Sequence, residues 1–379
     1  MDLDLNDEQQ MLGDMVREVC ADLAPLTRLR ELEDDPVGYD AALWAKLAEL
    51  DLIGLLLPAA YGGSEMSLIE GVVVHTELGR ALAPSPLFVS SVVAAGCLVA
   101  AGNDEQRQTW LPKVASGEAI LSVAWLEPDN GSGPRGVQLR AERDGDDYVL
   151  TGTKRHALFA SSAQRLVVPV RVGDGDGDID LLLVDPNADG VTLTQQMTIA
   201  SDTQYRVDLD GVRVAADDRI GAAGSGWATF AAVLRDAMVL AAAQAVGGAR
   251  FALDITVEYS KDRVQFDKPL GAFQALSHYM ADATTAIDGA EGLVWEAAWA
   301  ASAGRPEAVK LAPMAKLFAC DTFRDTTAMA QQIFGGVGFT LEYDIQLYFR
   351  RAKQLQLSWG DAPYLEALIA TEVLDAPAA

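Results

Sequence analysis

The stretch "GWATFAAVLRDAMVLAAAQAVGGARFALDITVEYSKDRVQF", residues 226–266, decides the fold. It is long and rich in alanine, and its apolar residues recur at helical spacing. Two stretches of similar length and character follow it, at 273–304 and 307–336. Because long helices joined by short loops pack into antiparallel bundles, we expect a four-helix-type bundle over residues 223–379.

Between residues 119 and 222 the composition and spacing of the sequence change. Short runs rich in β-branched residues, such as "YVLTGTKRHALFA", "QRLVVPVRV" and "YRVDLDGVRV", are divided by Gly, Asp and Asn. This pattern predicts an antiparallel sheet or a small barrel. The run "GDGDGDID" at 173–180 suggests either a Ca²⁺ loop or a hairpin tip. It lacks the EF-hand spacing and the closing Glu, which favours the hairpin tip.

The N-terminal part of the chain has helical spacing. A capped helix is expected to begin at Asn6 and to stop before Pro25. In "YDAALWAKLAELDLIGLLLP" one helical face carries Leu43, Leu47, Leu50 and Ile53. "MSLIEGVVVHTELGRALAPSP" predicts a third helix, and "NDEQRQTWLPKVASGE" a short capped one that is broken at Pro112. The predicted fold is therefore mainly α with a central β domain, in three domains at 1–118, 119–222 and 223–379.

Composition limits the partners and the compartment. The net charge is −26 and the pI about 4.3, which argues against nucleic-acid binding and leaves phosphate binding to a few local cations. The three cysteines are widely spaced, so we expect a reducing compartment, no disulfide framework and no metal site. The N-terminus is acidic and no apolar run reaches the ~20 residues of a membrane span. We expect a soluble cytoplasmic protein without a membrane partner.

A glycine-rich stretch, "QQIFGGVGFT" at 331–340, interrupts this helical half. Glycine inside a helix costs about 1 kcal/mol relative to alanine. One explanation is a turn that closes a helix, which a single glycine often does. A glycine pair followed by a third also fits the close approach of another group to the backbone.

Four stretches carry a resemblance to a known family. They are "LWAKLAELDLIGLLLPAAYGG" (43–63), "LSVAWLEPDNGS" (121–132), "YSKDRVQFDKPLGAFQ" (259–274) and "QQIFGGVGFTLEYDIQLYFRRAK" (331–353). In sequence and order they resemble acyl-CoA dehydrogenases, and the helix–sheet–helix layout agrees with that family. The resemblance covers nearly the whole chain.

The resemblance implies a flavoprotein oxidoreductase of lipid metabolism and β-oxidation. Such enzymes bind FAD, are usually tetrameric, and convert an acyl-CoA thioester to the trans-2-enoyl-CoA. A carboxylate removes the α proton, flavin N5 takes the β hydrogen as hydride, and electrons pass to an electron-transfer flavoprotein. Removing a proton from so weak a carbon acid requires a positioned base and a stabilised enolate oxygen.

The resemblance also implies which residues bind FAD across a subunit interface. Gln332, Gly335 and Gly336 correspond to the family's "Q-x-x-G-G", whose glycines let amide groups approach phosphate oxygens. Arg263 would pair with the pyrophosphate, as arginine is suited to bidentate phosphate binding. The remaining members of this surface would be Gln265, Phe266, Phe273 and Gln274.

Other positions depart from the family pattern around the chain's own flavin. Leu126 stands where a threonine usually touches the flavin ring, so one hydrogen bond is lost or is made by a backbone amide. Ser132 keeps the position expected to touch flavin or pantetheine. His156 lies near a usual tryptophan and would either stack on the flavin or be an ordinary strand residue. Asp361 falls where a threonine contacts the cofactor.

The catalytic base is the largest departure. In one branch of the family it is a glutamate near the C-terminus, and this slot holds Trp359. In another branch it projects from the long helix, and that slot falls on Ala237. The neighbouring Asp236 is the candidate base, although one residue corresponds to a 100° turn of the helix and Asp is shorter than Glu. An exposed, solvated aspartate is the alternative.

These departures leave two main hypotheses. The chain is an FAD-dependent acyl-CoA dehydrogenase, as a homotetramer or dimer, with Asp236 or an unassigned base. Alternatively it is a supporting subunit of an α₂β₂ assembly, which completes the FAD site of a partner chain and contributes little turnover itself. A flavin oxidase or monooxygenase on the same scaffold is a third possibility, and a ligand-free structural protein is the weakest.

Overall fold

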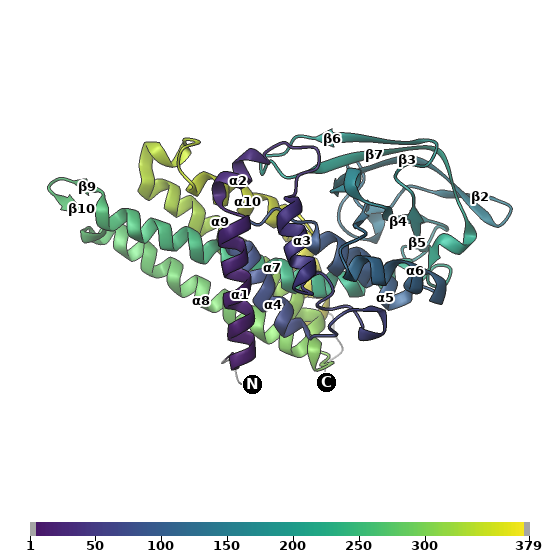
Figure 1. Ribbon diagram of the computed structural model, residues 1–379, viewed down its shortest axis with the longest axis horizontal. Helices are drawn as coiled ribbons and strands as arrows, with labels where there is room; N and C mark the ends of the chain where they lie inside the picture. Colours follow the sequence, from purple (N-terminus) through teal and green to yellow (C-terminus); the bar gives the residue numbers. More distant parts are fainter. Residues whose placement is uncertain (1–4, 375–379) are drawn as a thin grey trace. The chain divides into compact units, whose positions relative to one another are not determined.

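The alanine-rich stretch forms one continuous helix, α7 (Gly226–Asp262), as shown in Figure 1. The computed structural model describes residues 5–374 and divides into two compact units, whose boundary falls inside α7. The first unit contains the described residues of 1–29, 68–83 and 238–379. The second contains residues 30–67 and 84–237.

The first unit is a helical bundle. Besides α7, its helices are α1 (Asp7–Leu23), α4 (Leu68–Arg80), α8 (Gln274–Ser302), α9 (Ala308–Phe334), α10 (Ile345–Leu357) and α11 (Ala362–Val373). Helix α9 packs against α8, α10 and α11, and α4 packs against α1 and α8. Arg250 links α7 to α8 through ion pairs with Asp288 (2.6 Å) and Glu291 (2.9 Å). The predicted bundle of long helices is confirmed.

Two glycines allow α4 and α7 to cross in direct contact. A Cβ added to Gly79 would lie 2.2 Å from the Gln244 carbonyl oxygen. One added to Gly247 would lie 1.9 Å from the Thr76 carbonyl oxygen. No side chain fits in either space, so the backbones themselves form this crossing.

The second unit begins with shorter helices. These are α3 (Ala41–Glu49), a π-helical turn at Phe88–Ala94, α5 (Ala95–Ala101) and α6 (Asp104–Ala115), while α2 (Leu26–Glu31) spans the unit boundary. The predicted face of α3 is too long, because the helix ends before Leu50 and Asp51 has a positive φ of 56°. The predicted break at Pro112 is also wrong. Helix α6 continues through it, and the Ser116 N–H donates to the Pro112 carbonyl.

Two open four-stranded sheets make up the β region. One has the order β2 (Ala141–Asp144), β3 (Asp147–Leu158), β7 (Gln204–Val214), β6 (Val191–Gln196) and is antiparallel. The other has the order β1 (Leu121–Val123), β4 (Arg165–Arg171), β5 (Ile179–Val184), β8 (Arg219–Ile220). Its β1–β4 pair is parallel. The sheet prediction is confirmed, but the barrel alternative is wrong because neither sheet closes.

A single apolar cluster fills the space between these sheets. It combines side chains of β3 and β7 with side chains of β4 and β5, including Tyr148, Val207, Val168 and Leu182. The buried Tyr148 hydroxyl donates to Asp180 on β5 at 2.9 Å, so the core also contains a polar link between the sheets. This packing fixes the position of the strands that carry the candidate site residues.

Helix α7 is apolar enough to cross a membrane by length and composition alone. Its most apolar window has a mean hydropathy of 1.4, and 72% of that window is buried within the fold. The expectation that no run in this chain meets the length criterion is therefore wrong. Such burial is the pattern of a core helix, which satisfies the same criteria, so α7 is only weak evidence for a span.

Candidate functional site

The ends of α7 and α9 meet at one end of the bundle. Tyr259 on α7 stacks on Phe334 on α9, with ring centroids 4.2 Å apart and an interplanar angle of 15°. Arg263 follows Tyr259 by one helical turn, and its N–H donates to the Tyr259 carbonyl. Gly335 and Gly336 follow Phe334 directly. The structure therefore brings the predicted arginine and the predicted glycine pair to the same end, which we call the bundle end (residues 259–274 and 331–343).

A small hairpin projects from this end, visible at the left of Figure 1. Strand β9 (Val264–Gln265) pairs with β10 (Lys268–Pro269), and both turn residues, Phe266 and Asp267, have positive φ angles of 52° and 63°. Positive φ at both central residues defines a type I′ turn, which usually takes Asn-Gly. Phe266 is 86% exposed, and its ring lies edge-to-face with the Phe273 ring, at 6.4 Å between centroids.

The three glycines of "QQIFGGVGFT" differ in the constraint that the fold places on each position. Gly335 adopts φ +67° and ψ −141°, a conformation that essentially only glycine reaches. Gly338 is packed, since an added Cβ would lie 3.0 Å from the Phe334 Cβ and 3.1 Å from the Gln331 carbonyl oxygen. Gly336 has neither constraint, because its φ is not positive and an added Cβ would have nothing within 4 Å. The space beside Gly336 is open for a group from outside the chain.

The chemistry of the bundle end fits the diphosphate of a dinucleotide. No carboxylate in residues 5–374 forms an ion pair with the exposed Arg263, so this guanidinium is available for an anion. A Cβ added to Gly335 or Gly336 would meet nothing within 4 Å, although the Gly335 N–H itself donates to the Gln331 carbonyl. The predicted Gln265, Gln274 and Gln332 are all exposed. FAD would be held here by the arginine, the open backbone at Gly336 and the exposed aromatic ring.

A second group of predicted residues lies in the β region. Leu126 and Ser132 are half-buried in the loop between β1 and β2. The Leu126 carbonyl accepts the Arg155 N–H of β3 at 2.8 Å, an isolated bridge that joins the loop to the strand. His156 is the next residue on β3, so the structure brings the Leu126 and His156 stretches together.

His156 occupies an irregular position of β3. Its φ is +57°, and the register with β7 shifts between Lys154 and Ala157. Its backbone N–H donates to Gln196, and its Nδ1 lies 2.8 Å from the buried Gln204 side chain. Bulges of this kind redirect a side chain, here into an exposed position held by Gln204.

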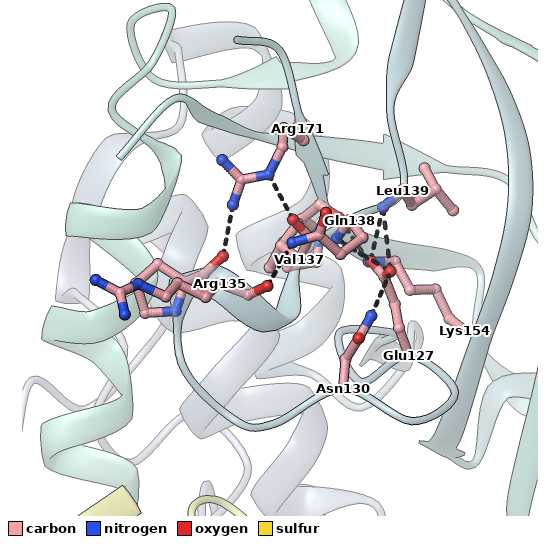
Figure 2. Close-up of polar contacts among 10 residues, drawn as sticks. Glu127, Asn130, Arg135, Val137, Gln138, Leu139, Lys154 and Arg171 are labelled. Carbon is pink, nitrogen blue, oxygen red and sulfur yellow. Dashed lines mark hydrogen bonds and ion pairs between the residues drawn. The ribbon is translucent and has the colours of Figure 1, made fainter. Parts of the chain in front are cut away.

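The loop that carries Leu126 and Ser132 is anchored by a buried ion pair (Figure 2). Glu127 is 9% exposed, Lys154 is fully buried, and Lys154 Nζ lies 2.7 Å from Glu127 Oε1. Figure 2 shows the Asn130 side chain and the Gln138 and Leu139 N–H groups converging on the same carboxylate. Burial lowers the pKa of the Lys154 ammonium, and the Glu127 carboxylate opposes this effect.

The predicted base slots both hold buried apolar side chains. Trp359 is 6% exposed with φ +58°, and Ala237 is fully buried. Asp236 is exposed at the surface of the single chain, so the helix turns it away from the face of Ala237. Desolvation by the surrounding protein nevertheless raises the pKa of the Asp236 carboxyl, while Arg235 opposes that shift. The structure thus leaves Asp236 with the raised pKa of a candidate base but on a different face.

A buried lysine holds the turn after Trp359. Lys316 on α9 is fully buried and donates to the Gly360 carbonyl at 2.5 Å and to the Gln356 carbonyl at 3.3 Å. Asp361 caps α11, with its side chain accepting the Tyr364 N–H at 3.2 Å. The Asp361 carboxylate is therefore already engaged in a helix cap, whatever else it contacts.

Metal binding finds no support in the described residues. Within residues 5–374 no group of three or more His, Cys, Asp or Glu side chains could hold a metal ion. The "GDGDGDID" run is the hairpin connection between β4 and β5, as predicted. Two of its carboxylates form ion pairs, Asp174 with Arg140 and Asp176 with Arg135.

Comparison with protein families matches three successive parts of the chain. Residues 6–118 match the acyl-CoA dehydrogenase N-terminal domain, residues 122–212 the middle domain and residues 224–374 the C-terminal domain. The chain belongs to the acyl-CoA dehydrogenase family. Members of this family are oxidoreductases and flavoproteins.

Individual acyl-CoA dehydrogenases resemble the chain over its whole length. A probable acyl-CoA dehydrogenase, YngJ of Bacillus subtilis, is 33% identical over 99% of this chain and 100% of its own. The solved ChsE4–ChsE5 complex of Mycobacterium tuberculosis contains a chain 28% identical with a TM-score of 0.90, covering 100% of both chains. The solved Tcur3481–Tcur3483 steroid ACAD contains one 32% identical with a TM-score of 0.87, covering 97% of this chain and 98% of that one.

Sequence reasoning missed the buried cations of this acyl-CoA dehydrogenase. Lys154 lies in the stretch "KRHALFASS", in which only His156 was predicted to be a site residue. Lys316 lies in an ordinary amphipathic helix. Because lysine is rarely fully buried, the residue type gives no sign that either side chain lies in the core. Glu127 could have been found from its position in the motif "LEPDNGS". It directly follows Leu126, which lies at the family's flavin-contact position.

Proposed function

We propose that this chain is a subunit of an FAD-dependent acyl-CoA dehydrogenase that converts an acyl-CoA thioester to the trans-2-enoyl-CoA. The bundle end carries the proposal. There an arginine without a carboxylate partner in the described part of the chain, an exposed aromatic ring and an open glycine lie together at one end of the unit. These groups complete the nucleotide site of a neighbouring subunit.

The reaction sets clear demands on the protein. When bound, FAD would supply the hydride acceptor for the β hydrogen. The protein must supply a base for the α proton and hydrogen-bond donors for the developing enolate oxygen. In this chain Asp236 is the candidate base, with its pKa raised by desolvation. Electrons then pass to an electron-transfer flavoprotein, and we place the reaction in cytoplasmic fatty-acyl β-oxidation.

A specific observation favours a second role, that of a supporting subunit. Both slots for the family's base hold buried apolar side chains, Trp359 and Ala237. Loss of a general base costs on the order of 10²–10⁴ in rate. Two of the similar solved structures are pairs of different proteins, ChsE4–ChsE5 and Tcur3481–Tcur3483. In this role a partner chain supplies the base, and this chain completes the FAD site.

Reductive bleaching of the flavin separates the two roles. The chain is purified alone and after co-expression with a second acyl-CoA dehydrogenase chain from the same organism. Flavin absorbance is then followed anaerobically after adding acyl-CoA thioesters of different length. Bleaching by the chain alone supports the dehydrogenase role, and bleaching only with the partner supports the supporting role. If neither sample binds FAD, both proposed roles are refuted.

Arg263 provides the matched variants for this experiment. Arg263→Ala should lower FAD occupancy, and Arg263→Lys should restore only part of it, because lysine cannot bind a phosphate in bidentate fashion. The control is Arg305→Ala, which removes another exposed arginine of the same unit, paired with Glu307 at 3.6 Å. Equal FAD occupancy in the Arg263→Ala and Arg305→Ala proteins would exclude the bundle end as the nucleotide site.

A further inference from the structure

We propose that Glu127 and Lys154 form a positioning clamp that fixes the loop of residues 127–139 against β3, and so sets the flavin-facing side of the β region. The flavin part of this inference rests on the proposed function. The clamp itself is a statement about loop order and can be tested without flavin. Neither residue is expected to touch the cofactor.

The clamp joins three separate segments through one carboxylate and one ammonium. Glu127 accepts the Gln138 and Leu139 N–H groups, each at 3.0 Å, which closes the loop on itself. Lys154 on β3 donates to Glu127 at 2.7 Å and to the Pro169 carbonyl on β4 at 2.8 Å. Loop, β3 and β4 are thereby tied at a single point, and Figure 2 shows the part of it around Glu127 and Lys154.

The chemistry explains why charged residues occupy this buried point. Two adjacent backbone N–H groups need acceptors once they leave water, and a carboxylate has lone pairs for both. A buried carboxylate in turn needs a cation, because an unpaired buried charge is strongly unfavourable. Lys154 meets that need, and a second of its N–H groups donates to the Pro169 carbonyl. An apolar pair of equal volume would leave the loop amides without acceptors.

The clamp residues are sequence neighbours of the predicted flavin contacts. Glu127 directly follows Leu126, whose carbonyl accepts the Arg155 N–H at 2.8 Å. Lys154 precedes Arg155 and lies two residues before His156, at the start of the β3 irregularity. A movement of either clamp residue therefore shifts both stretches together.

The far side of the same loop is held independently. Arg171 is 5% exposed and donates to the Val137 and Pro134 carbonyls, each at 2.7 Å. Gly136 packs so closely on the loop that an added Cβ would lie 1.8 Å from the Gly131 carbonyl oxygen. Arg171 and the exposed Arg135–Asp176 pair hold this side of the loop, and Glu127 holds the other side. Loss of Glu127 therefore loosens the segment between residues 127 and 134, which contains Ser132.

Limited proteolysis measures how firmly the clamp holds the loop. Arg135 lies in the loop with its side chain 85% exposed, so trypsin cleavage after it reports loop opening. Glu127→Ala should raise the rate of this cleavage at least tenfold. Asp144→Asn, which breaks the exposed Asp144–Arg213 pair on β2 and β7, should leave it within twofold. Wild-type cleavage rates in Glu127→Ala would overturn the proposal, whether or not flavin binds.

Flavin affinity tests the consequence of the clamp. Glu127→Ala should weaken FAD binding at least tenfold, measured by quenching of flavin fluorescence. Val212→Ala, on β7 in the core between the sheets, should lower the melting temperature without removing a clamp contact, and it should change neither readout. If Val212→Ala opens the loop and weakens FAD equally, the effect is general destabilisation and the proposal fails. If wild-type protein binds no FAD, the proposed function fails, and cleavage after Arg135 still decides the clamp.

A double variant covers the case in which Glu127→Ala does not fold. Glu127→Gln with Lys154→Met removes both charges but keeps an amide oxygen for the Gln138 and Leu139 N–H groups. This protein should fold. Because its loop amides keep an acceptor while the tie to β3 is lost, its cleavage rate after Arg135 and its FAD affinity should lie between those of wild type and those of the single Lys154→Met variant. The single Lys154→Met variant leaves the Glu127 carboxylate buried without its cation and should open the loop. Equal behaviour of the single and double variants would overturn the proposal.

Discussion

Tyr259 and Phe334 stack face to face with centroids 4.2 Å apart, and Tyr343 closes on the edges of both rings. Residues 84 positions apart in sequence are thus joined by aromatic contact (343 minus 259). Aromatic pairs contribute ~0.5–1.5 kcal/mol beyond the area they bury. The stack connects the arginine at the end of α7 to the glycines at the end of α9.

Phe334→Ala is expected to separate these two groups. Phe334 is 8% exposed, and a buried Phe→Ala change costs about 3 kcal/mol or more. FAD affinity should fall in addition, measured at a temperature where the protein remains folded. Phe323→Ala is the control, because Phe323 is also buried on α9 but packs beside Gly248. Equal loss of FAD affinity in both variants would contradict a specific role for the stack.

Gly335→Ala should lower stability, whereas Gly336→Ala should lower FAD affinity. Alanine at Gly335 must adopt φ +67°, which costs at least ~1–2 kcal/mol of stability. Alanine at Gly336 has open space in the single chain, so the melting temperature should stay within a degree or two, while FAD affinity falls because the new methyl fills that space. Calorimetry and FAD titration on both variants check this. Unchanged FAD affinity in Gly336→Ala would show that nothing approaches this backbone.

Lys316→Met should loosen the Trp359 turn and change the pH dependence of stability. Burial lowers the pKa of Lys316, so between its folded and unfolded pKa values the unfolded chain binds more protons. Wild-type stability therefore rises with pH as the pH approaches the unfolded value of 10.5, and Lys316→Met should lack this rise. Hydrogen exchange of the amides at 358–361 should quicken in the variant. Lys261→Met, on the exposed end of α7, should change neither.

His75 predicts a second pH effect, on the acid side. Burial lowers its pKa to about 3 from 6.5, and its Nδ1 lies 3.0 Å from the Gln244 amide nitrogen. As pH falls from 6.5 towards 3 the unfolded chain gains the proton first, so stability drops by about 1.4 kcal/mol per pH unit from this group. Urea unfolding at pH 7 and pH 5 measures the slope. His75→Gln should remove it, and His278→Gln, on the exposed side of α8, should not.

The long elements were predictable because their periodicity is local. Asn6 caps α1 with a full capping box, as its neighbours Asp7, Glu8 and Gln9 indicate. The end of α3 was misjudged because an apolar run resumes at residues 52–57, which are mostly buried turns rather than helix. An apolar pattern records burial, and here burial continued after the helix had ended.

The candidate sites were predictable only in part. Motif resemblance grouped Arg263 with Gly335 and Gly336, and the structure brings their helix ends together. Whether these residues bind FAD stays a prediction. The parallel β1–β4 pair and the Glu127–Lys154 contact depend on strand order, which a single sequence does not specify.

The β9–β10 hairpin has a tip that is already shaped in the single chain. Phe266 and Asp267 hold left-handed conformations in a turn that most chains give to Asn and Gly. Their conformational penalty is met when the polypeptide folds, before any encounter. Docking then needs no reshaping of the tip, which lessens the entropy lost on association. If subunits assemble through the bundle end, as the proposed function requires, the rate of assembly should depend on collision and charge rather than on loop rearrangement.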